Sequence, residues 1–372
     1  MSTELIGPVQ PEVISPATRY ITALVTRGAS AYVENAHVTM EAPEVDGRLT
    51  PLVINDGPAR GNTNVCSAYA HYHDYAAHEF ARRFGKVASA LLSAPRALFG
   101  AYLRLIHVDR IVYVNNWLFA TNPRHGLTAD QIAELTKHLT RRFPDSAIVF
   151  RSLNRMADPA GLDAILANDY RLVPSRQIYL VDTASGRHLE RGDFRNDFAM
   201  LRKTPYSIVA DAAELAPHAA RIAELYRDLY LRKHSRLNPH YNAEFFAMLF
   251  NSGLMNHRAF IRDGRVDALT SYIVEDGLMT AVLTCYDLDL PRKLALYRMA
   301  FVLMIAEAGE RRMLLNLSAG VGEFKMLRGA IAVQEYDAVY DRHLPRSRRI
   351  AWSAVSAVAG LGQRFSPRSQ LR

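Results

Sequence analysis

The chain has little cysteine and no long apolar segment. Its two cysteines, Cys66 and Cys285, lie far apart in 372 residues and form no CxxC pair, which argues against a disulfide framework and against a cysteine zinc site. No stretch of 18 apolar residues occurs, and the N-terminus lacks the basic start and apolar run of a secretory signal. We therefore expect a cytoplasmic protein without a transmembrane helix.

Acidic residues are absent after Asp341, where seven arginines follow. Because the formal net charge is +8, residues 1–341 carry only +1, and a broad polyanion-binding surface is not expected on the body. The basic tail has a weakly apolar centre at 350–361. Three interpretations stay open for this tail: a helix packed on its own protein, a contact with a membrane surface, or a contact with RNA.

One order of elements occurs twice in the chain: a strand, a proline-led turn, a long helix, a strand, a loop, a short helix and a closing strand. A length of 372 residues suffices for two such cores, and an apolar fraction of 49% suits a globular protein. We therefore predict two copies of one α/β unit. The first copy has strands at 111–120, 147–153 and 177–181 with helices at 128–142 and from Pro159; the second has strands at 278–286, 313–317 and 333–340 with helices at 291–308 and 323–328.

The region between the two copies is predicted to begin the second domain. Segment 187–202 reads as a helix with its polar face in water, and apolar residues recur at helical spacing over 216–234. A further helix over 242–250 is ended by Gly253. Strands at 257–262 and 267–275 are then joined by the Asp263-Gly264 turn, which predicts an antiparallel hairpin.

The segment 315–330, LNLSAGVGEFKMLRGA, carries a family resemblance. A strand ends in a glycine-bearing loop, and a Phe-Lys pair and then Gly-Ala follow. This pattern resembles the GNAT acyltransferase superfamily, in particular its Fem-type peptidoglycan aminoacyltransferases and CelD-like acetyltransferases, which pair two such units. The resemblance covers 190–340 well and 100–185 as topology. It implies an α/β (α+β) fold of tandem GNAT-like domains, each a mixed sheet flanked by helices: a degenerate unit at 1–190, a catalytic unit at 191–345 and a basic tail at 346–372.

The resemblance also implies where an acyl donor binds. In GNAT domains two parallel strands splay apart and the acyl-carrier arm inserts between them, which corresponds here to 278–286 and 313–317. The usual phosphate loop that follows lacks its glycines in this chain, at 289–296, although Arg292 and Lys293 offer positive charge there. An acyl-CoA or other acyl thioester is the expected co-substrate, with no tightly bound cofactor and no metal; aminoacyl-tRNA stays open as the donor. The implied cofactor-binding residues are Thr284, Cys285, Arg292, Lys293, Asn316 and Phe324.

Four side chains are candidates for the chemistry of acyl transfer to an amine. Tyr286 and Asp287 end the first splayed strand, and Lys325 matches the family's motif lysine. His234 lies among Arg232, Lys233 and Arg236, where it suits a base or a basic pocket for an acidic acceptor. A turn-forming role for Asp287 and a surface position for Lys325 are the alternatives. Phe324 stands where simpler GNAT enzymes often have the tyrosine that protonates the thiolate.

Polar residues in the first copy are candidates for substrate binding. Asn115 and Asn116 precede Trp117 in an otherwise apolar strand, where they either pin a turn or face a ligand between the domains. The segment 66–79 holds three histidines, including His71. An amphipathic helix, a substrate pocket and a metal site are the alternatives for this segment.

The sequence thus predicts an N-acyltransferase that moves an acyl group from a thioester to a small-molecule or peptide amine, in specialised-metabolite or cell-envelope biosynthesis. Two alternatives stay open: an aminoacyl-tRNA-dependent Fem-type aminoacyltransferase, and a non-catalytic pseudo-acyltransferase that only binds a ligand. Nucleic acid is not expected as a partner except for tRNA as donor. A peripheral membrane contact through the tail stays open, so the expected location is cytoplasmic with or without membrane association.

Overall fold

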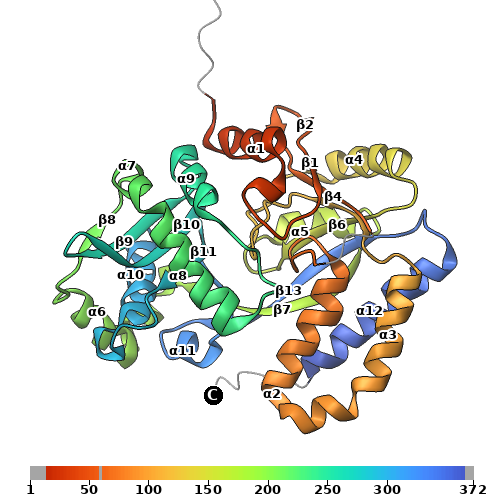
Figure 1. Ribbon diagram of the computed structural model, residues 1–372. Helices are drawn as coiled ribbons and strands as arrows, with labels where there is room; N and C mark the ends of the chain where they lie inside the picture. Colours follow the sequence, from red (N-terminus) through yellow and green to blue (C-terminus); the bar gives the residue numbers. More distant parts are fainter. Residues whose placement is uncertain (1–13, 58–60, 365–372) are drawn as a thin grey trace, which may run out of the picture.

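Eleven strands form one continuous mixed sheet in the computed structural model, which describes residues 14–57 and 61–364 (Figure 1). A separate two-stranded ribbon pairs β2 (Glu44–Val45) with β3 (Arg48–Leu49). In spatial order the main sheet consists of β1 (Thr39–Glu41), β4 (Leu52–Asp56), β5 (Arg110–Val114), β6 (Ala147–Leu153), β13 (Ile331–Tyr340), β7 (Arg171–Asp182), β12 (Leu314–Ala319), β11 (Leu278–Tyr286), β10 (Arg265–Glu275), β9 (Asn256–Arg262) and β8 (Ser207–Val209).

The two units exchange their closing strands at the centre of this sheet. β7 closes the first unit but pairs with β12 of the second, whereas β13 closes the second unit and pairs with β6 of the first. β7 and β13 also pair with each other along their length. The two predicted units therefore share one sheet, and neither unit can complete its sheet without a strand from the other.

A serine in the left-handed region marks the same bulge in both units. Ser152 in β6 has φ 63° and Ser318 in β12 has φ 58°. Each lies where the register with the closing strand shifts, between Phe150 and Leu153 in one unit and between Asn316 and Ala319 in the other. This correspondence supports the predicted duplication.

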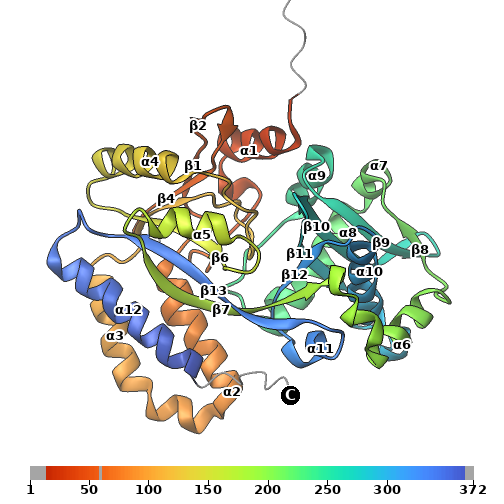
Figure 2. The same cartoon turned by 180° about the vertical axis from the view of Figure 1, so that it is seen from behind.

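Helices cover both faces of the sheet (Figures 1 and 2). In the second unit, α10 and α6 pack on one face and α8 and α9 on the other, with α1 against α9. In the first unit, α4 and α5 pack with β5 and β6. The helices are α1 (Pro16–Arg27), α2 (Ala76–Leu91), α3 (Ser93–Leu105), α4 (Ala129–Arg142), α5 (Pro159–Leu166), α6 (Gly192–Leu201), α7 (Ala212–Leu215), α8 (Ala219–Tyr226), α9 (Ala243–Ser252), α10 (Leu296–Glu310), α11 (Gly322–Met326) and α12 (Arg346–Arg364), with the short turns η1 (Ala29–Ala31), η3 (Thr183–Ser185), η4 (Arg187–Glu190), η5 (Ala216–His218) and η7 (Arg292–Leu294) and the π-helical segments η2 (Ala70–Tyr75) and η6 (Arg227–His234).

Helix boundaries follow local sequence signals where capping residues are present. α4 begins after a capping box in which Thr128 accepts from the Gln131 backbone and the Gln131 side chain accepts from Thr128. α9 begins after Asn242 and ends at Gly253, whose φ of 70° suits glycine. Both predicted helices are confirmed, as are the 257–262 and 267–275 hairpin and the strands at 147–153 and 278–286.

Two predicted boundaries are wrong. The long helix does not begin at Pro291; a 3-10 turn comes first, and α10 begins after Ala295, which adopts a left-handed φ of 53°. The strand predicted at 111–120 stops at Val114 because Asn115 turns the chain with φ 55°. The helix predicted over 216–234 is confirmed in extent, as the 3-10 turn η5 followed by α8 and the π-helical η6.

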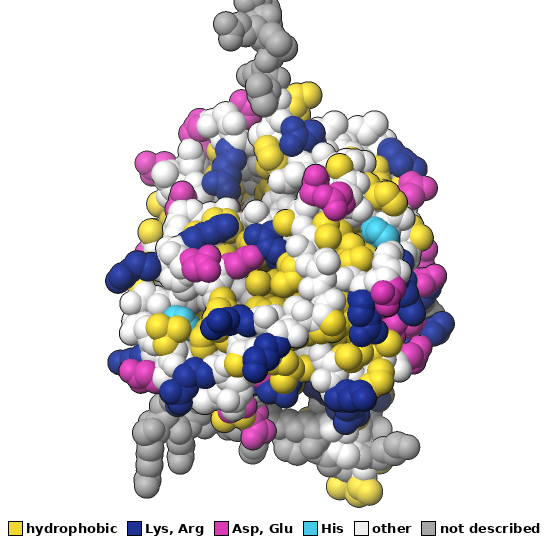
Figure 3. Space-filling model, turned by 90° about the vertical axis from the view of Figure 1, so that its left-hand side faces the viewer, with side chains coloured by type: hydrophobic (Ala, Val, Ile, Leu, Met, Phe, Trp, Pro, Cys, Tyr) yellow, Lys and Arg dark blue, Asp and Glu magenta, His cyan; other side chains and the backbone are white. Residues whose placement is uncertain are grey.

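The basic tail forms α12, which packs on β7 of its own protein. Ala351, Trp352 and Val355 face the core, and the Trp352 ring meets the edge of Tyr72. Arg368 and Arg372 lie outside the described residues. In the ranges 14–57 and 61–364, no helix is long and apolar enough to cross a membrane. On the outer side of the second unit, basic and acidic side chains are interspersed, as expected for a nearly neutral body (Figure 3).

Replacement of Trp352 with alanine should destabilise the protein by about 3–5 kcal/mol, because it removes a fully buried ring under α12. The free energy of unfolding from urea titration measures the loss. Ile350→Ala is the matched control on the same helix, since Ile350 is 61% exposed and Trp352 only 1%. Equal effects of the two substitutions would contradict the packing described for α12.

Candidate acyl-donor site between splayed strands

The parallel strands β11 and β12 pair over only three positions. Leu278, Met279 and Thr280 face Leu314, Leu315 and Asn316, and no further pairs follow. β11 nevertheless continues to Tyr286, paired only with β10 along 281–286. The predicted divergence of these two strands is confirmed, and one edge of β11 lacks a β12 partner beyond Thr280.

A β-bulge lies on β11 next to the point of divergence. Ser271 and Tyr272 of β10 face Leu283 and Ala281, so Val282 has no residue opposite it. Thr284 bonds Thr270, which faces Met304 of α10, whereas Cys285 packs in the core beneath α8. Burial raises the pKa of the Cys285 thiol to about 12, which keeps this thiol protonated. The sequence pattern of residues 278–286 did not predict this bulge.

Lys325 lies inside the protein and holds the end of β12. Its Nζ donates to the carbonyl oxygens of Leu317 at 2.7 Å, Ser318 at 3.2 Å and Ala319 at 2.7 Å. The structure therefore places Lys325 in the core and not on the surface. Burial and the nearby Arg176 guanidinium lower the pKa of Lys325 to about 7.

An aromatic group connects the end of β11 with the helix after β12. The Tyr297 ring, on the first turn of α10, lies 5.5 Å from the Tyr286 ring and 4.9 Å from the Phe324 ring of α11. Phe301 packs against both Tyr297 and Phe324. Arg328 stacks over Phe324 at 3.6 Å. These contacts fix the distance between the two splayed arms of the sheet.

The N-terminus of α10 carries positive charge and no capping side chain. Its cap residue, Ala295, makes no side-chain hydrogen bond, and no acidic residue lies in the first turn. Arg292 and Lys293 are exposed on the turn just before it. The free backbone N–H groups and the two cations give an arrangement that can attract an anion.

Asp197 ties the helices around this site together. It is fully buried on α6 and accepts from Arg298 of α10 and from Arg328 Nε at 2.7 Å. The predicted solvated helix over 187–202 is therefore wrong at this position, because a charge paired with two arginines holds α6 against the core. Sequence periodicity alone cannot distinguish such a buried aspartate from a surface one.

Asp287 is engaged in a second buried ion-pair group. Its Oδ2 accepts from Arg221 and, at 2.6 Å, from Arg265, and its Oδ1 accepts from the Asp289 backbone at 2.9 Å. Tyr286 is partly exposed beside it, and its hydroxyl lies 3.4 Å from Lys233 Nζ. Asp287 thus holds the turn after β11, whereas the Tyr286 side chain is partly exposed.

A pocket of about 700 Å³ lies between α2 of the first unit and the end of η6 in the second. Burial lowers the pKa of His234, and Arg82 and Lys233 add to the effect. The His234 ring lies 6.1 Å from that of Tyr230 on the same helix. The pocket residues are Asp74, Ala77, His78, Ala81, Ser89, Arg96, Leu231, Arg232, His234, Ser235, Arg236 and Leu237.

The asparagines of the first unit bond within the protein. Asn115 accepts from Trp117 Nε1 at 2.8 Å and donates to the Pro123 carbonyl at 2.8 Å. Asn116 donates to the Val65 carbonyl at 2.7 Å and accepts from the Leu118 backbone. These bonds correspond to the turn-pinning interpretation of the pair.

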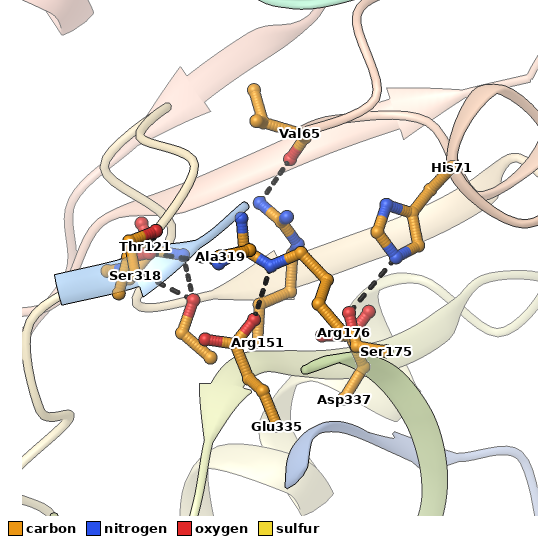
Figure 4. Close-up of polar contacts among 12 residues, drawn as sticks. Val65, His71, Thr121, Arg151, Ser175, Arg176, Ser318, Ala319, Glu335 and Asp337 are labelled. Carbon is orange, nitrogen blue, oxygen red and sulfur yellow. Dashed lines mark hydrogen bonds and ion pairs between the residues drawn. The ribbon is translucent and has the colours of Figure 1, made fainter. Parts of the chain in front are cut away.

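Charged side chains that sequence reasoning missed converge where the two units meet (Figure 4). Arg176 of β7 donates to Glu335 of β13 at 2.7 Å and to Thr121 at 2.9 Å, and Thr121 bonds Ser318 at 2.7 Å. Arg151 of β6 donates to the Val65 carbonyl at 3.0 Å. This polar junction links the first unit to the end of β12. Arg151 and Glu335, charged residues within predicted strands, were the sequence features that could have indicated this buried polar junction.

The three histidines of 66–79 have separate partners. His71 bonds Ser175 at 3.0 Å, and His73 bonds Asp74 at 2.7 Å and the Arg96 carbonyl. His78 lies in the pocket instead. Within the part of the chain that the structure describes, no group of three or more His, Cys, Asp or Glu side chains is placed to hold a metal ion.

Replacement of Lys325 with methionine should change how stability depends on pH. The pKa of Lys325 is depressed from 10.5 to about 7 in the folded state, so the unfolded chain binds the additional proton between these values. The free energy of unfolding of the wild type should therefore rise relative to Lys325→Met, by more than about 1 kcal/mol, as pH increases from 7 to 10.5.

Denaturant titrations across this pH range measure that difference. Lys293→Met removes an exposed lysine and serves as the matched control, with a flat difference from wild type expected. A flat difference for Lys325→Met as well would show that Lys325 titrates as an ordinary surface lysine.

No protein-family model matches the chain, and comparison with curated proteins found no relative. Among solved structures, the C-terminal DUF2156 domain of a protein described as a lysylphosphatidylglycerol synthetase, from Agrobacterium fabrum, has 12% identity and a TM-score of 0.51, covering 92% of this chain and 96% of that one. FemX matches with 8% identity and a TM-score of 0.43, over 56% and 76%. A tandem GNAT protein from the clavulanic acid biosynthesis pathway matches with 13% identity and a TM-score of 0.36, over 62% and 74%.

At these identities the similarity concerns the fold. The first of these structures extends over nearly the whole of both chains. In this protein, each of two units has a parallel strand pair, and the closing strands are exchanged between the units. The chain therefore shares the fold of this DUF2156 domain, built here from two α/β units in one sheet.

Proposed function

We propose that this protein transfers an acyl group from an acyl thioester to an amine. The observation that carries the proposal is the divergence of β11 from β12 after Thr280 and Asn316. An extended donor arm with amide groups, such as the pantetheine chain of coenzyme A, has hydrogen-bonding groups that match the unpaired edge of 281–286. The anionic end of that donor would lie at the start of α10, near Arg292 and Lys293.

The chemistry requires an oxyanion site, an acceptor site and a base. The β-bulge at Val282 changes the direction of the backbone N–H groups next to the unpaired edge of β11. This geometry supports a role for these N–H groups as hydrogen-bond donors to the oxyanion. The pocket between α2 and η6 supports an acceptor position, since it lies between the two units and contains basic side chains. The lowered pKa of His234 leaves its imidazole neutral at pH 7 and able to accept a proton.

In the proposed reaction the amine nitrogen attacks the thioester carbonyl carbon. A new C–N bond forms, a ring nitrogen of His234 takes up the proton of the amine, and the C–S bond breaks. The thiolate leaves and takes up a proton, which gives an amide and a free thiol. Lys325 has no direct part in these steps; it is a positioning residue that holds the carbonyls at the end of β12.

Aminoacyl-tRNA is the second candidate donor. The observation that favours it is the absence of glycines at 289–296, where close backbone approach to a pyrophosphate would need them. The aromatic group of Tyr286, Tyr297 and Phe324 at the end of the splay also offers flat faces on which the bases of a tRNA end can stack. A pseudo-acyltransferase that binds a ligand without turnover is a third outcome that binding and turnover assays separate.

Acetyl-CoA should bind the wild type and raise its melting temperature, and Arg292→Ala/Lys293→Ala should weaken binding at least about 10-fold because two cations near the anionic groups are lost. Calorimetric titration measures the affinity. Arg311→Ala/Arg312→Ala, at the opposite end of α10 and also exposed, is the matched control and should bind as wild type. Binding of aminoacyl-tRNA in the absence of acyl-CoA binding would select the second donor.

His234→Gln should lower the rate of thiol release from the thioester by about 100-fold or more with any amine that is turned over, because the base is lost. A thiol-reactive dye with a panel of amines measures release. His240→Gln, on the loop after η6, is the control for histidine loss. Unchanged turnover in His234→Gln would remove His234 from the proposed mechanism.

A further inference from the structure

Exposed aliphatic side chains gather at one end of the molecule. Fifteen large hydrophobic side chains are exposed among the described residues, and eight of them belong to two segments, 85–105 and 346–361. These segments are the second half of α2 with α3, and most of α12; together they are called the helical tip. The eight are Val87, Leu91, Leu92, Leu98, Leu105, Ile350, Val358 and Leu361.

The parts of the helical tip lie side by side. α2, α3 and α12 are neighbours in both views, and the turn between α2 and α3 lies at the same end as the last turns of α12 (Figures 1 and 2). Tyr102 of α3 donates to the Ser347 carbonyl of α12 at 3.2 Å. Gly85, with φ 84°, interrupts α2 and redirects its second half. The exposed residues therefore belong to one helical assembly.

Both long helices of the tip carry a second apolar stripe in addition to the one that packs on the protein. On α3, Leu103 is buried, whereas Leu98 and Leu105 are exposed and seven residues apart. On α12, Trp352 is buried, whereas Ile350 and Leu361 are exposed. A helix needs only one apolar stripe to pack on its own core. The outward stripes therefore have no partner in the described part of the chain.

Charge in the helical tip is of one sign. The sequence has no acidic residue in 80–108 and none after Asp341. Arg96, Arg104, Arg346 and Arg349 are exposed on α3 and α12. The outer face of the second unit differs, because acidic and basic side chains alternate over it (Figure 3). Aliphatic side chains surrounded by arginines, with no acidic residue among them, complement a binding surface that has a negatively charged outer layer and an apolar layer beneath it.

We propose that the helical tip docks on the surface of a bilayer that contains anionic phospholipids. The aliphatic side chains enter the boundary between headgroups and acyl chains, and the arginines contact the lipid phosphates. A protein partner would instead need an acidic surface around a matching apolar seam, which this chain does not offer to a second copy at the tip. Ser89 and Arg96 of the tip also line the pocket between α2 and η6, but the docking proposal rests on the exposed aliphatic and basic side chains and does not depend on the proposed acyl transfer.

Vesicle flotation of the full chain tests the proposal. Wild-type protein should float with vesicles of equal parts phosphatidylglycerol and phosphatidylcholine and stay behind with pure phosphatidylcholine, and added salt should weaken the binding. Leu91→Glu/Leu98→Glu should lower the partition coefficient on the anionic vesicles at least about 10-fold. These side chains are 77% and 73% exposed, so the variant should keep the wild-type melting temperature.

Leu189→Glu/Ile208→Glu replaces two exposed aliphatic residues outside the helical tip and should bind within about 2-fold of wild type. A second variant, Arg104→Glu/Arg349→Glu, tests the charge contribution and should also lose binding. Equal binding to both vesicle types overturns the proposal. So does wild-type vesicle binding by Leu91→Glu/Leu98→Glu, and so does a dimer in solution that this variant abolishes while vesicle binding is unchanged.

Discussion

The exchange of β7 and β13 is the constraint on which the rest of the structure depends. Because β7 pairs with β12 and β13 pairs with β6, while β7 and β13 pair with each other, β6 and β12 cannot move independently. β12 is therefore held away from the end of β11 by its pairing with β7, and the divergence after Thr280 is a property of the whole sheet. A single isolated unit would lack this restraint.

Buried cations maintain the same geometry at side-chain level. The ammonium of Lys325 substitutes for the β11 strand at the carbonyls of 317–319, so these acceptors are satisfied while the sheet stays open. Arg176 of β7 bonds Glu335 of β13 and also Thr121, which bonds Ser318 at the bulge of β12. Asp197 and Asp287, each with two arginines, fix the helix and the turn that border the site. Removal of one partner from such a group leaves a buried charge unpaired, which is costly.

The sequence was sufficient to predict helices and hairpins that are specified by local capping and turn residues. Thr128 and Gln131, Asn242 and Gly253, and the Asp263-Gly264 turn specify their helices and hairpin through short-range hydrogen bonds and left-handed backbone, and these elements were predicted correctly. The divergence of the splayed strands followed from the family resemblance of 315–330. The prediction failed where the contacts are non-local. Asp197 looks like a surface residue in its helix, and only arginines from α10 and from the turn after α11 make its burial possible.

The same distinction explains the candidate site. Tyr286 ends β11, and Arg292 and Lys293 lie in the turn before α10; these places follow from the sequence because the segment directly follows β11. The burial of Lys325 and the polar junction of Arg151, Arg176 and Glu335 could not, because they depend on the strand exchange and on the bulges at Ser152 and Ser318. For Asn115 and Asn116 the sequence left turn-pinning and ligand-facing roles open, and bonds to the Pro123 and Val65 carbonyls correspond to the former.

Hydrogen–deuterium exchange of segment 281–286, with and without saturating acetyl-CoA, tests the central claim most directly. Amides on the unpaired edge of β11 should exchange faster than those of the paired β9–β10 hairpin in the free protein and should become protected when the donor binds. Saturated binding without any added protection in 281–286, or full protection of this segment before the donor is added, would contradict the splayed strands as the donor site.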